Sequence, residues 1–327
     1  MKKIAVMGAG SWGCALAILL NKNGHEVKLW THTQNEADSI NLNHENKEYL
    51  PGIEIPKEIF VSSDSNKVLN DAEYVIIAVP SKFVRESVKK FSIQPCSIII
   101  NVAKGIENST FLRMSQIIKE IVNGCDIVTL SGPTHAEEVS RFLPTTCVAA
   151  SENLQAALQV QKLFNNEFFR VYTSSDIIGV ELGGTLKNII ALAAGVADGL
   201  GFGDNTKAAI INRGILEIAR FGEKLGARTE TFYGLSGMGD LLVTCISNHS
   251  RNRRAGILLG QGLSLDETLK KVHMVVEGVN SAKSVNELAK KLNVDMPIVS
   301  EINKMLYEGK SPKQSVLDLM MREAKEE

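Results

Sequence analysis

The N-terminal residues 2–13, KKIAVMGAGSWG, restrict the fold more than any other part of this chain. A short apolar run, Ile4–Met7, is followed directly by Gly8, Gly10 and Gly13. In a strand–turn–helix unit, the first glycine permits the tight turn, the second leaves room for a pyrophosphate, and the third lets the helix pack closely. The helix N-terminus offers N–H groups and a positive dipole end to that anion. The flanking strand and helix supply the context that the motif requires, so the segment predicts a dinucleotide-binding unit, with an ordinary tight turn as the alternative.

Length and charge narrow the class of protein. The chain has 327 residues and a formal net charge of −1. The length suggests two domains with a buried core. The near-neutral charge provides no field that would attract nucleic acid or an anionic membrane, so we expect a small-molecule substrate and neither of those partners. The apolar run after Lys2 and Lys3 is broken by glycines and lacks a cleavage site, and no segment has the uninterrupted apolar length of a transmembrane helix.

The cysteines are odd in number, widely spaced and without a CxxC pair. They are Cys14, Cys96, Cys125, Cys147 and Cys245. This pattern favours reduced thiols in a cytoplasmic protein over a disulfide framework. The sequence has no paired Cys/His spacing and no HExxH motif, so we expect no metal; it has no GxSxG motif, which argues against acyl transfer by a serine.

Residues 1–176 alternate strand-like and helix-like segments. The predicted strands are Ile4–Met7, His25–Trp30, Asp71–Pro80, Ser97–Val102, Asp126–Leu130, Thr145–Ala150 and Phe168–Tyr172. Ser151 is predicted to cap a helix that continues to about Phe164. Repeated alternation of this kind indicates an α/β domain with a mainly parallel, doubly wound sheet, whose ligands should lie beyond the carboxyl ends of the strands.

Residues 177–327 have a different pattern, with helical spacing and little sign of strands. The predicted helices are Ile177–Leu200, Thr206–Leu225, Arg251–Gly260, Ser281–Leu292, Pro297–Glu308 and Pro312–Glu326. We therefore expect a dinucleotide-binding domain over 1–176 and a helical domain, for the substrate and for catalysis, over 177–327. The small residues of Leu182–Leu200 suit close helix packing, either within one subunit or across a homodimer.

The segment after the second predicted strand bears on which dinucleotide would bind. An NAD site usually has a carboxylate there for the ribose hydroxyls, whereas this chain has Thr31, His32 and Thr33. The missing acid leaves room for the extra phosphate of NADP, which slightly favours NADPH over NADH. His32 is a candidate contact for that phosphate or for adenine, and an ordinary surface histidine is an equally good interpretation.

Two lysines stand in positions that could serve a reaction. Lys104 follows a predicted strand, where it would point toward the ligand crevice, although such a lysine is more often a solvated loop residue. Lys187, with Asn188, interrupts a long apolar stretch. Burial lowers the pKa of a lysine and makes it a usable base near neutral pH. The alternative is a lysine whose ammonium extends into solvent from the edge of the helix.

Asp240 ends a glycine-flanked turn, Ser236–Asp240. Its carboxylate could orient a lysine or bind a substrate hydroxyl. On spacing alone, capping of the helix that follows is the simpler interpretation.

The segment Asn248–Arg254, NHSRNRR, has the features of a phosphate site. Ser250 is predicted to cap a helix whose first turn carries Arg251 and Asn252, and a helix N-terminus with arginine and hydroxyl donors suits a phosphate dianion. A solvated basic turn is the simpler alternative. Binding of nucleic acid is disfavoured because the segment lacks interleaved aromatic residues and a wider basic field.

Taken together, these segments resemble the bacterial-type NAD(P)-dependent glycerol-3-phosphate dehydrogenases over nearly the whole chain. The ordered set of matching motifs is highly specific. It comprises GAGSWGCALA (8–17), GHEVKLW (24–30), YLPG (49–52), AVPS (78–81), AKGIE (103–107), SGPTHAEEV (131–139), ELGGTLKNIIALAAGVADGLGFGDNTKAA (181–209), GLSGMGDLLVTC (234–245), SRNRRAG (250–256) and VEGV (276–279).

The resemblance implies a Rossmann-type doubly wound sheet followed by an all-helical domain like that of 6-phosphogluconate dehydrogenase. It implies an oxidoreductase that uses NAD(P)H to reduce dihydroxyacetone phosphate reversibly to sn-glycerol 3-phosphate, for glycerophospholipid biosynthesis. No association with nucleic acid or integral association with a membrane is expected.

The resemblance also assigns roles to residues. Lys187 matches the catalytic proton acceptor, Lys104 a lysine that touches both cofactor and substrate, and Asp240 a residue of the substrate pocket that would set the charge and orientation of Lys187. The cofactor-binding positions are Gly8, Gly10, Ser11, Trp12, Gly13, His32, Tyr49, Lys104, Ala136, Arg251, Val275 and Glu277. The substrate-binding positions are Lys104, Gly132, Thr134, Lys187, Asp240, Ser250, Arg251 and Asn252.

Two other functions are compatible with the sequence. One is a related two-domain dehydrogenase that acts on a sugar acid or another hydroxy acid. Another is a non-catalytic NAD(P)H sensor, although such a protein would not need the lysine and aspartate of the helical domain. The arginine-bearing helix start favours a phosphorylated substrate.

Overall fold

The computed structural model describes residues 1–95, 97–324 and 326, and the chain divides into two compact units. The first unit is Met1–Lys104 with Leu112–Glu181, and the second is Gly105–Phe111 with Leu182–Glu327. Cys96, one of the predicted reduced thiols, lies outside the described residues. The expected boundary at 176/177 coincides with the start of helix α8 (Ile177–Gly199), whereas the division by contacts falls inside that helix.

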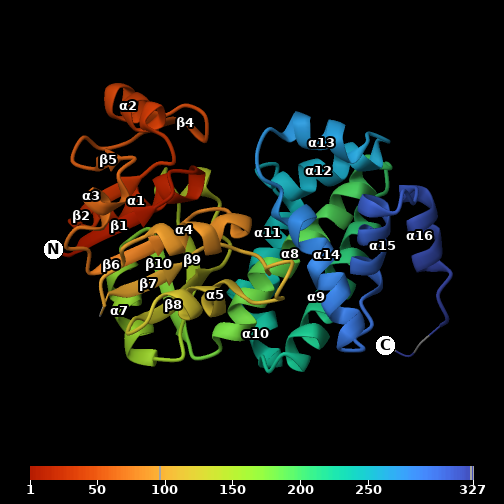
Figure 1. Cartoon of the computed structure of the whole chain (residues 1–327). Helices are drawn as coiled ribbons and strands as arrows, with labels where there is room; N and C mark the ends of the chain where they lie inside the picture. The colour runs from red at the N-terminus through yellow and green to blue at the C-terminus, as the bar shows by residue number, and fades with distance from the viewer. Residues whose placement is uncertain (96, 325, 327) are drawn as a thin grey trace. The chain divides into compact units, whose positions relative to one another are not determined.

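The first unit is built on an eight-stranded sheet in the order β10-β9-β8-β7-β6-β1-β2-β5. Its neighbouring strands are parallel except for the antiparallel pair β8 and β9. The strands are β1 (Lys3–Met7), β2 (Glu26–Trp30), β5 (Phe60–Ser62), β6 (Tyr74–Ile77), β7 (Ile98–Asn101), β8 (Asp126–Ser131), β9 (Thr145–Ala150) and β10 (Phe169–Ser174) (Figure 1). The α/β fold class with a doubly wound sheet is confirmed.

Alternation along the strands places a core on each face of this sheet. On β1, Ile4 and Val6 pack into one core, and Ala5 and Met7 pack into the other. The first core includes residues of α1 (Ser11–Lys22), α2 (Gln34–Asn43), α6 (Ala136–Val139) and α7 (Leu154–Phe164). The second includes residues of α3 (Ser65–Leu69), α4 (Val84–Lys90) and α5 (Met114–Ile121). Strands buried on both faces explain the nearly continuous apolar runs in the sequence.

The sequence misplaces one helix cap in this unit. Asn153, not Ser151, caps α7, because the Asn153 side chain accepts a hydrogen bond from the Gln155 N–H. Ser151 instead donates its hydroxyl to the carbonyl of Ile127, at 2.7 Å. Both residue types favour N-caps, and the partner on β8 decides between them.

The second unit is helical. It contains α8 beyond Glu181, then α9 (Asp204–Lys224), α10 (Thr229–Tyr233), a π-helical turn (Leu235–Gly239), α11 (Asp240–Ile246), α12 (Arg251–Gly260), α13 (Leu265–Val272), α14 (Glu277–Lys291), α15 (Pro297–Tyr307) and α16 (Pro312–Met320) (Figure 1).

Two predicted helix ends in this unit are wrong. Helix α14 begins at Glu277 rather than Ser281, because Asn252 accepts the Gly278 N–H and so orders a first turn that has low helix propensity. Helix α16 ends at Met320 rather than Glu326; Met320 and residues 321–324 are exposed, so burial does not stabilise a further helical turn over this stretch.

Helix α8 is the central element of the second unit. By length and composition it could cross a membrane, but 89% of its most apolar window is buried inside the protein, as in the core helix of a globular domain. Gly195 explains part of this burial, because a Cβ there would lie 2.1 Å from the carbonyl oxygen of Arg253 on α12. The close approach of α8 and α12 brings the start of α12 beside the segment that carries Lys187.

Candidate functional site

One candidate site belongs to the first unit and lies at the carboxyl ends of β1, β6 and β7. Strand β1 pairs with β2 on one side and with β6 on the other, so the direction of strand succession reverses between β1 and β6. Such a switch point is where doubly wound sheets bind their ligands. Gly8 follows β1 and Lys104 follows β7, which brings the glycine turn and this lysine to the same edge of the sheet.

The three glycines of the N-terminal turn differ in why a side chain would be unfavourable at each position. Gly8 has a φ of +132°, and a Cβ there would lie 2.7 Å from the carbonyl oxygen of Ala78. A Cβ on Gly13 would lie 1.8 Å from the carbonyl oxygen of Gly8. A Cβ on Gly10 would meet no atom within 4 Å. Gly8 and Gly13 are therefore required by the fold, whereas Gly10 leaves open space beside the backbone.

The start of α1 has the features of an anion site. Gly10 occupies the N-cap position and supplies no side chain to cap the helix. Ser11 and Trp12 begin the first turn. Ser11 is buried, and the partly buried Trp12 packs against the core. Backbone N–H groups at an uncapped helix start, next to the open space at Gly10, fit the pyrophosphate of a dinucleotide.

A short hairpin, β3 (Glu45–Asn46) and β4 (Leu50–Glu54), is tied to this turn, and the sequence analysis missed it. The buried Asn46 side chain donates to the carbonyl of Ala9, at 2.7 Å, and accepts from the Tyr49 N–H, at 3.1 Å. Asn46 thus fixes Tyr49, a predicted cofactor contact, relative to the glycine turn. A hydrogen bond with Glu48, together with burial, raises the pKa of the Tyr49 hydroxyl to about 12, so the phenol stays protonated.

The residues that directly follow β2, Thr31, His32 and Thr33, include no carboxylate. Thr31 donates to the carbonyl of Thr33, and Thr33 caps α2. His32 is exposed, and its ring meets that of Trp30 edge-on at 6.1 Å between centroids. Burial raises the pKa of the half-buried Glu36 carboxyl, and this favours its neutral form. The contact of His32 with the cofactor stays a prediction.

The predicted contacts after β8 also belong to the first unit. Gly132 has a φ of +153°, and a Cβ there would lie 2.9 Å from the Cα of Cys147, so the backbone passes close to β9. Thr134 donates to the carbonyl of Gly132, at 3.1 Å. The Ala136 side chain is buried in the core, so a cofactor contact there would be made by its backbone.

A second candidate site, in the second unit, is the environment of Lys187. The Lys187 side chain is only 8% exposed, and its ammonium donates to the Asp240 carboxylate and to the Thr244 hydroxyl, the latter at 2.7 Å. Thr244 in turn donates to the carbonyl of Asp240. A buried ammonium is tolerated only with such partners. Of the two interpretations of Lys187, the structure supports burial, not extension into solvent.

Asp240 does not cap the helix that it begins. Gly239 occupies the N-cap position of α11, and the Asp240 carboxylate, only 1% exposed, is used by Lys187 instead. The preceding π-helical turn lies against α8, since a Cβ on Gly183 would be 2.6 Å from the carbonyl oxygen of Ser236. This close packing brings Asp240 within reach of Lys187.

The start of α12 has the predicted cap. Ser250 accepts the Arg253 N–H, at 3.2 Å, which leaves its hydroxyl proton unused by this contact. The Asn252 amide links three helices: it donates to Asn188 of α8, at 2.9 Å, and accepts from Gly278 of α14, at 2.9 Å. These two bonds also fix the first turn of α14, which holds Glu277 and follows Val275.

Some charged side chains around α12 form ion pairs and hydrogen bonds within the protein. Arg253 donates to Asp198, at 2.7 Å, and to Asn248, at 2.8 Å. Lys207 of α9 binds the other carboxylate oxygen of Asp198. Arg253 therefore stabilises the packing of α8, α9 and α12, whereas Arg251 is the arginine of this turn that the resemblance assigns to ligands.

Sequence reasoning missed Thr244 and gave Asn188 no role. Thr244 lies four residues after Asp240 on α11, so helical spacing alone places both on one face. Asn188 interrupts the apolar stretch next to Lys187, and its buried amide holds Asn252. Polar residues adjacent to, or one turn from, a candidate catalytic residue are the signal that could have identified them.

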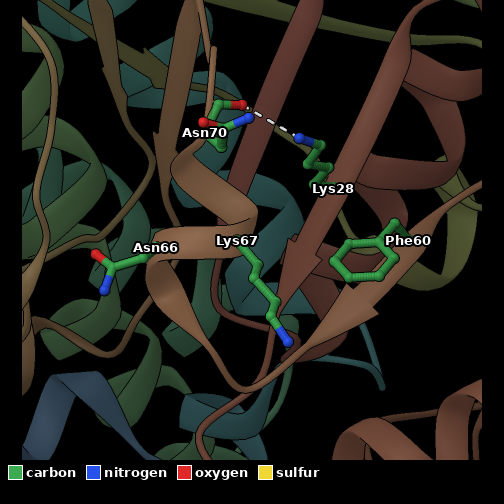
Figure 2. Close-up of a pocket in the computed structure, with 5 residues that line it drawn as sticks. All are labelled: Lys28, Phe60, Asn66, Lys67 and Asn70. Atoms are coloured by element: carbon green, nitrogen blue, oxygen red, sulfur yellow. Dashed lines mark hydrogen bonds between the residues drawn. The ribbon is translucent and has the colours of Figure 1, made fainter.

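A surface pocket of the first unit lies elsewhere (Figure 2). It is lined by Lys28, Phe60, Asn66, Lys67 and Asn70, and Lys28 donates to the Asn70 carbonyl, at 3.1 Å. None of these residues belongs to the predicted site.

Comparisons with known proteins cover both units. Residues 3–157 match the model of the NAD-dependent glycerol-3-phosphate dehydrogenase N-terminus, and residues 176–317 match the model of its C-terminus. The glycerol-3-phosphate dehydrogenase [NAD(P)+] of Thermoanaerobacter sp. (strain X514) is 53% identical over 327 residues, covering 99% of this chain and 98% of the relative. That of Fusobacterium nucleatum is 51% identical over 329 residues, with the same coverage.

Solved structures agree with these matches. The glycerol-3-phosphate dehydrogenase of Coxiella burnetii aligns with a TM-score of 0.94 and 35% identity, covering 98% of each chain. The enzyme of Saccharomyces cerevisiae aligns with a TM-score of 0.84 and 26% identity, covering 98% of this chain and 99% of that one. With the glycine turn, the buried lysine–aspartate pair and full-length similarity in agreement, this chain belongs to the NAD-dependent glycerol-3-phosphate dehydrogenase family.

Proposed function

We propose that this chain catalyses the reversible reduction of dihydroxyacetone phosphate to sn-glycerol 3-phosphate with NAD(P)H. The observation that carries the proposal is the buried Lys187, paired with Asp240 and Thr244, in a chain that belongs to this family. Reduction of a ketone needs a proton for the oxygen as the carbon receives a hydride. A desolvated, hydrogen-bonded ammonium is a suitable donor for that proton.

In the proposed mechanism, Lys187 gives its proton to the carbonyl oxygen as the alkoxide develops, and takes it back in the reverse direction. Asp240 and Thr244 hold the ammonium from two directions, which fixes its orientation before the reaction. Asp240 also supports the charged form of Lys187 in a buried environment. Lys104 would stabilise the negative charge that develops on the same oxygen.

The phosphate would be bound at the start of α12. The proposed phosphate ligands are the Ser250 hydroxyl, the N–H groups of the first turn, and the side chains of Arg251 and Asn252. Because the phosphate is remote from the reacting carbon, these contacts would position the carbon without taking part in the transfer. Gly132 and Thr134 are proposed as further substrate contacts.

The open space at Gly10 and the uncapped start of α1 support dinucleotide binding. When bound, the reduced nicotinamide supplies the hydride. Gly10 would admit the pyrophosphate to the N–H groups of Ser11 and Trp12, on a turn whose conformation depends on Gly8 and Gly13. The other proposed cofactor contacts are His32, Tyr49, Lys104, Ala136, Arg251, Val275 and Glu277.

The proposal extends to the cellular role on the basis of the family resemblance. The enzyme would supply glycerophospholipid biosynthesis in the cytoplasm. Packing of the small residues of Leu182–Leu200 across two subunits would allow a homodimer, and packing within one subunit is the alternative. Because β2 ends without a carboxylate for the ribose, NADPH is slightly favoured over NADH. The domain boundary at 176/177 is part of the same proposal.

The test follows the absorbance of the reduced nicotinamide when dihydroxyacetone phosphate is added to the purified protein with NADH or NADPH. We expect a fast loss of absorbance with dihydroxyacetone phosphate and little with unphosphorylated dihydroxyacetone. No loss in folded protein that binds NAD(P)H would contradict the proposal and favour a sensor. Equal rates with the two ketones would contradict the phosphate site.

A further inference from the structure

Glu181 is a buried carboxylate with no part in the mechanism above. Its side chain is 4% exposed and accepts four hydrogen bonds, all from the first unit. One oxygen accepts from the Ser115 N–H, at 2.8 Å, and from the Asn101 amide, at 3.4 Å. The other accepts from Arg113 and from the Ser115 hydroxyl. The charge is thus fully compensated, and each donor is held in one orientation.

Asn101, the last residue of β7, connects this carboxylate to the turn that carries Lys104. The Val102 N–H still donates to the carbonyl of Ile77 on β6, at 3.1 Å, and continues the sheet pattern. The Ala103 N–H donates instead to the Asn101 side-chain oxygen, at 3.1 Å, and the Asn101 amide donates to the Ala103 carbonyl, at 3.2 Å. The Asn101 side chain therefore fixes the backbone at the residue directly before Lys104.

Ala103 and Glu181 together set the orientation of the Asn101 amide. The amide has an acceptor oxygen on one side and a donor nitrogen on the other. The two hydrogen bonds with Ala103 require the oxygen to face the Ala103 N–H. A carboxylate can only accept, so Glu181 favours the orientation in which the amide nitrogen faces it. A rotated amide would bring its oxygen against the Glu181 oxygen and would leave the Ala103 N–H without its acceptor.

We propose that Asn101 and Glu181 are positioning residues that set the conformation of Lys104. The inference rests on the proposed function, because it assumes that Lys104 contacts the cofactor and the substrate. Arg113 and Ser115 complete the chain of contacts by holding Glu181. A shift of Lys104 of the order of 1 Å would lower the rate by about 10- to 100-fold.

The test compares Asn101→Ala, Glu181→Gln and Lys104→Ala with the wild-type enzyme, and combines Asn101→Ala with Lys104→Ala. A matched control is Ser97→Ala. Ser97 is buried just before the same strand and donates to the carbonyl of Ala72, at 2.9 Å, so its loss removes a buried hydrogen bond at the opposite end. The readouts are kcat, KM for dihydroxyacetone phosphate, the dissociation constant of NADPH and the melting temperature.

We expect Asn101→Ala and Glu181→Gln to lower kcat by about 10-fold or more, and Asn101→Ala to have little further effect in the Lys104→Ala background. Ser97→Ala should lower the melting temperature and leave kcat unchanged. A large loss in Lys104→Ala with normal kcat in the other two variants would overturn the inference alone. Normal kcat in Lys104→Ala would overturn the role of Lys104 and the inference with it. Additive losses in the double variant would show that Asn101 does not act through Lys104.

Discussion

At the residue scale, the features that the sequence predicts best depend only on the backbone of neighbouring residues. The tight turn at Gly8 and the close approach at Gly13 follow from the spacing of the glycines and the flanking strand and helix, and the structure has both. The environment of Lys187 could not be predicted in this way, because its partner Asp240 is distant in the sequence. Only the fold decides whether such a lysine is paired or solvated.

Gly10 gives a prediction at the same scale. Its φ of −65° suits alanine, and a Cβ there would meet no atom of the protein within 4 Å. We expect Gly10→Ala to fold normally but to raise the dissociation constant of NADPH by about 10-fold or more, since the methyl group would occupy space needed by the pyrophosphate. Fluorescence titration with NADPH measures the change.

The control for this variant is Gly203→Ala. Gly203 precedes α9 and has a φ of −84°, and a Cβ there would likewise meet no atom within 4 Å. Both glycines are N-caps, where alanine is less favourable, so Gly203→Ala should show a loss of stability like that of Gly10→Ala and should keep the wild-type affinity for NADPH. Wild-type affinity in Gly10→Ala would show that the pyrophosphate does not approach this residue.

At the scale of elements, apolar runs located the seven predicted strands because strands buried on both faces have few polar residues. The hairpin of β3 and β4 was missed. Its second strand, LPGIE, contains the turn-forming pair Pro51 and Gly52, and its order comes from Asn46, which binds the distant Ala9 carbonyl. Segments ordered by a tertiary contact lack a local signal.

Helix α15 depends on a contact of the same kind, which predicts a pH dependence. The buried Glu217 of α9 accepts from the Ile298 N–H, at 2.7 Å, and the Val299 N–H, at 3.3 Å. Burial raises the pKa of this carboxyl from 4.5 to about 7, although the two N–H groups and Arg220 oppose the rise, while Asp295 adds to it. Between these two pH values the folded protein retains a proton that the unfolded chain has lost.

The free energy of unfolding should therefore decrease as the pH rises from 4.5 to about 7, and level off above that. Glu217→Gln removes this contribution. Between pH 5 and pH 8, the melting temperature of this variant should rise relative to that of the wild type. The corresponding change in the difference between their free energies of unfolding is about 3 kcal/mol. The exposed Glu230→Gln is the control for the loss of a glutamate charge at the surface. A difference between Glu217→Gln and wild type that is independent of pH would refute the assignment.

At the scale of the whole molecule, the two units have separate tasks in the proposed reaction. The glycine turn for the dinucleotide belongs to the first unit, and the Lys187–Asp240 pair belongs to the second. Helix α8 carries residues of both, because Glu181 binds donors of the first unit and Lys187 binds Asp240. The change in sequence pattern near residue 176 indicated two domains, but it could not show that contacts divide the chain inside a helix.

This separation allows the role of Lys187 to be tested without loss of cofactor binding. Lys187→Ala removes the proton donor, and Lys187→Met does so while keeping most of the side-chain volume. Either change leaves Asp240 buried without its ammonium, which is destabilising. The double variant Lys187→Met/Asp240→Asn removes both charges together and serves as the folded control.

The most direct test of the account is therefore the kcat of these variants measured beside their dissociation constants for NADPH. We predict that kcat falls by about 10²- to 10⁴-fold or more, while the affinity for NADPH stays near that of the wild type. A loss of NADPH affinity as large as the loss of rate, or a kcat that survives the removal of Lys187, would contradict its role as the proton donor.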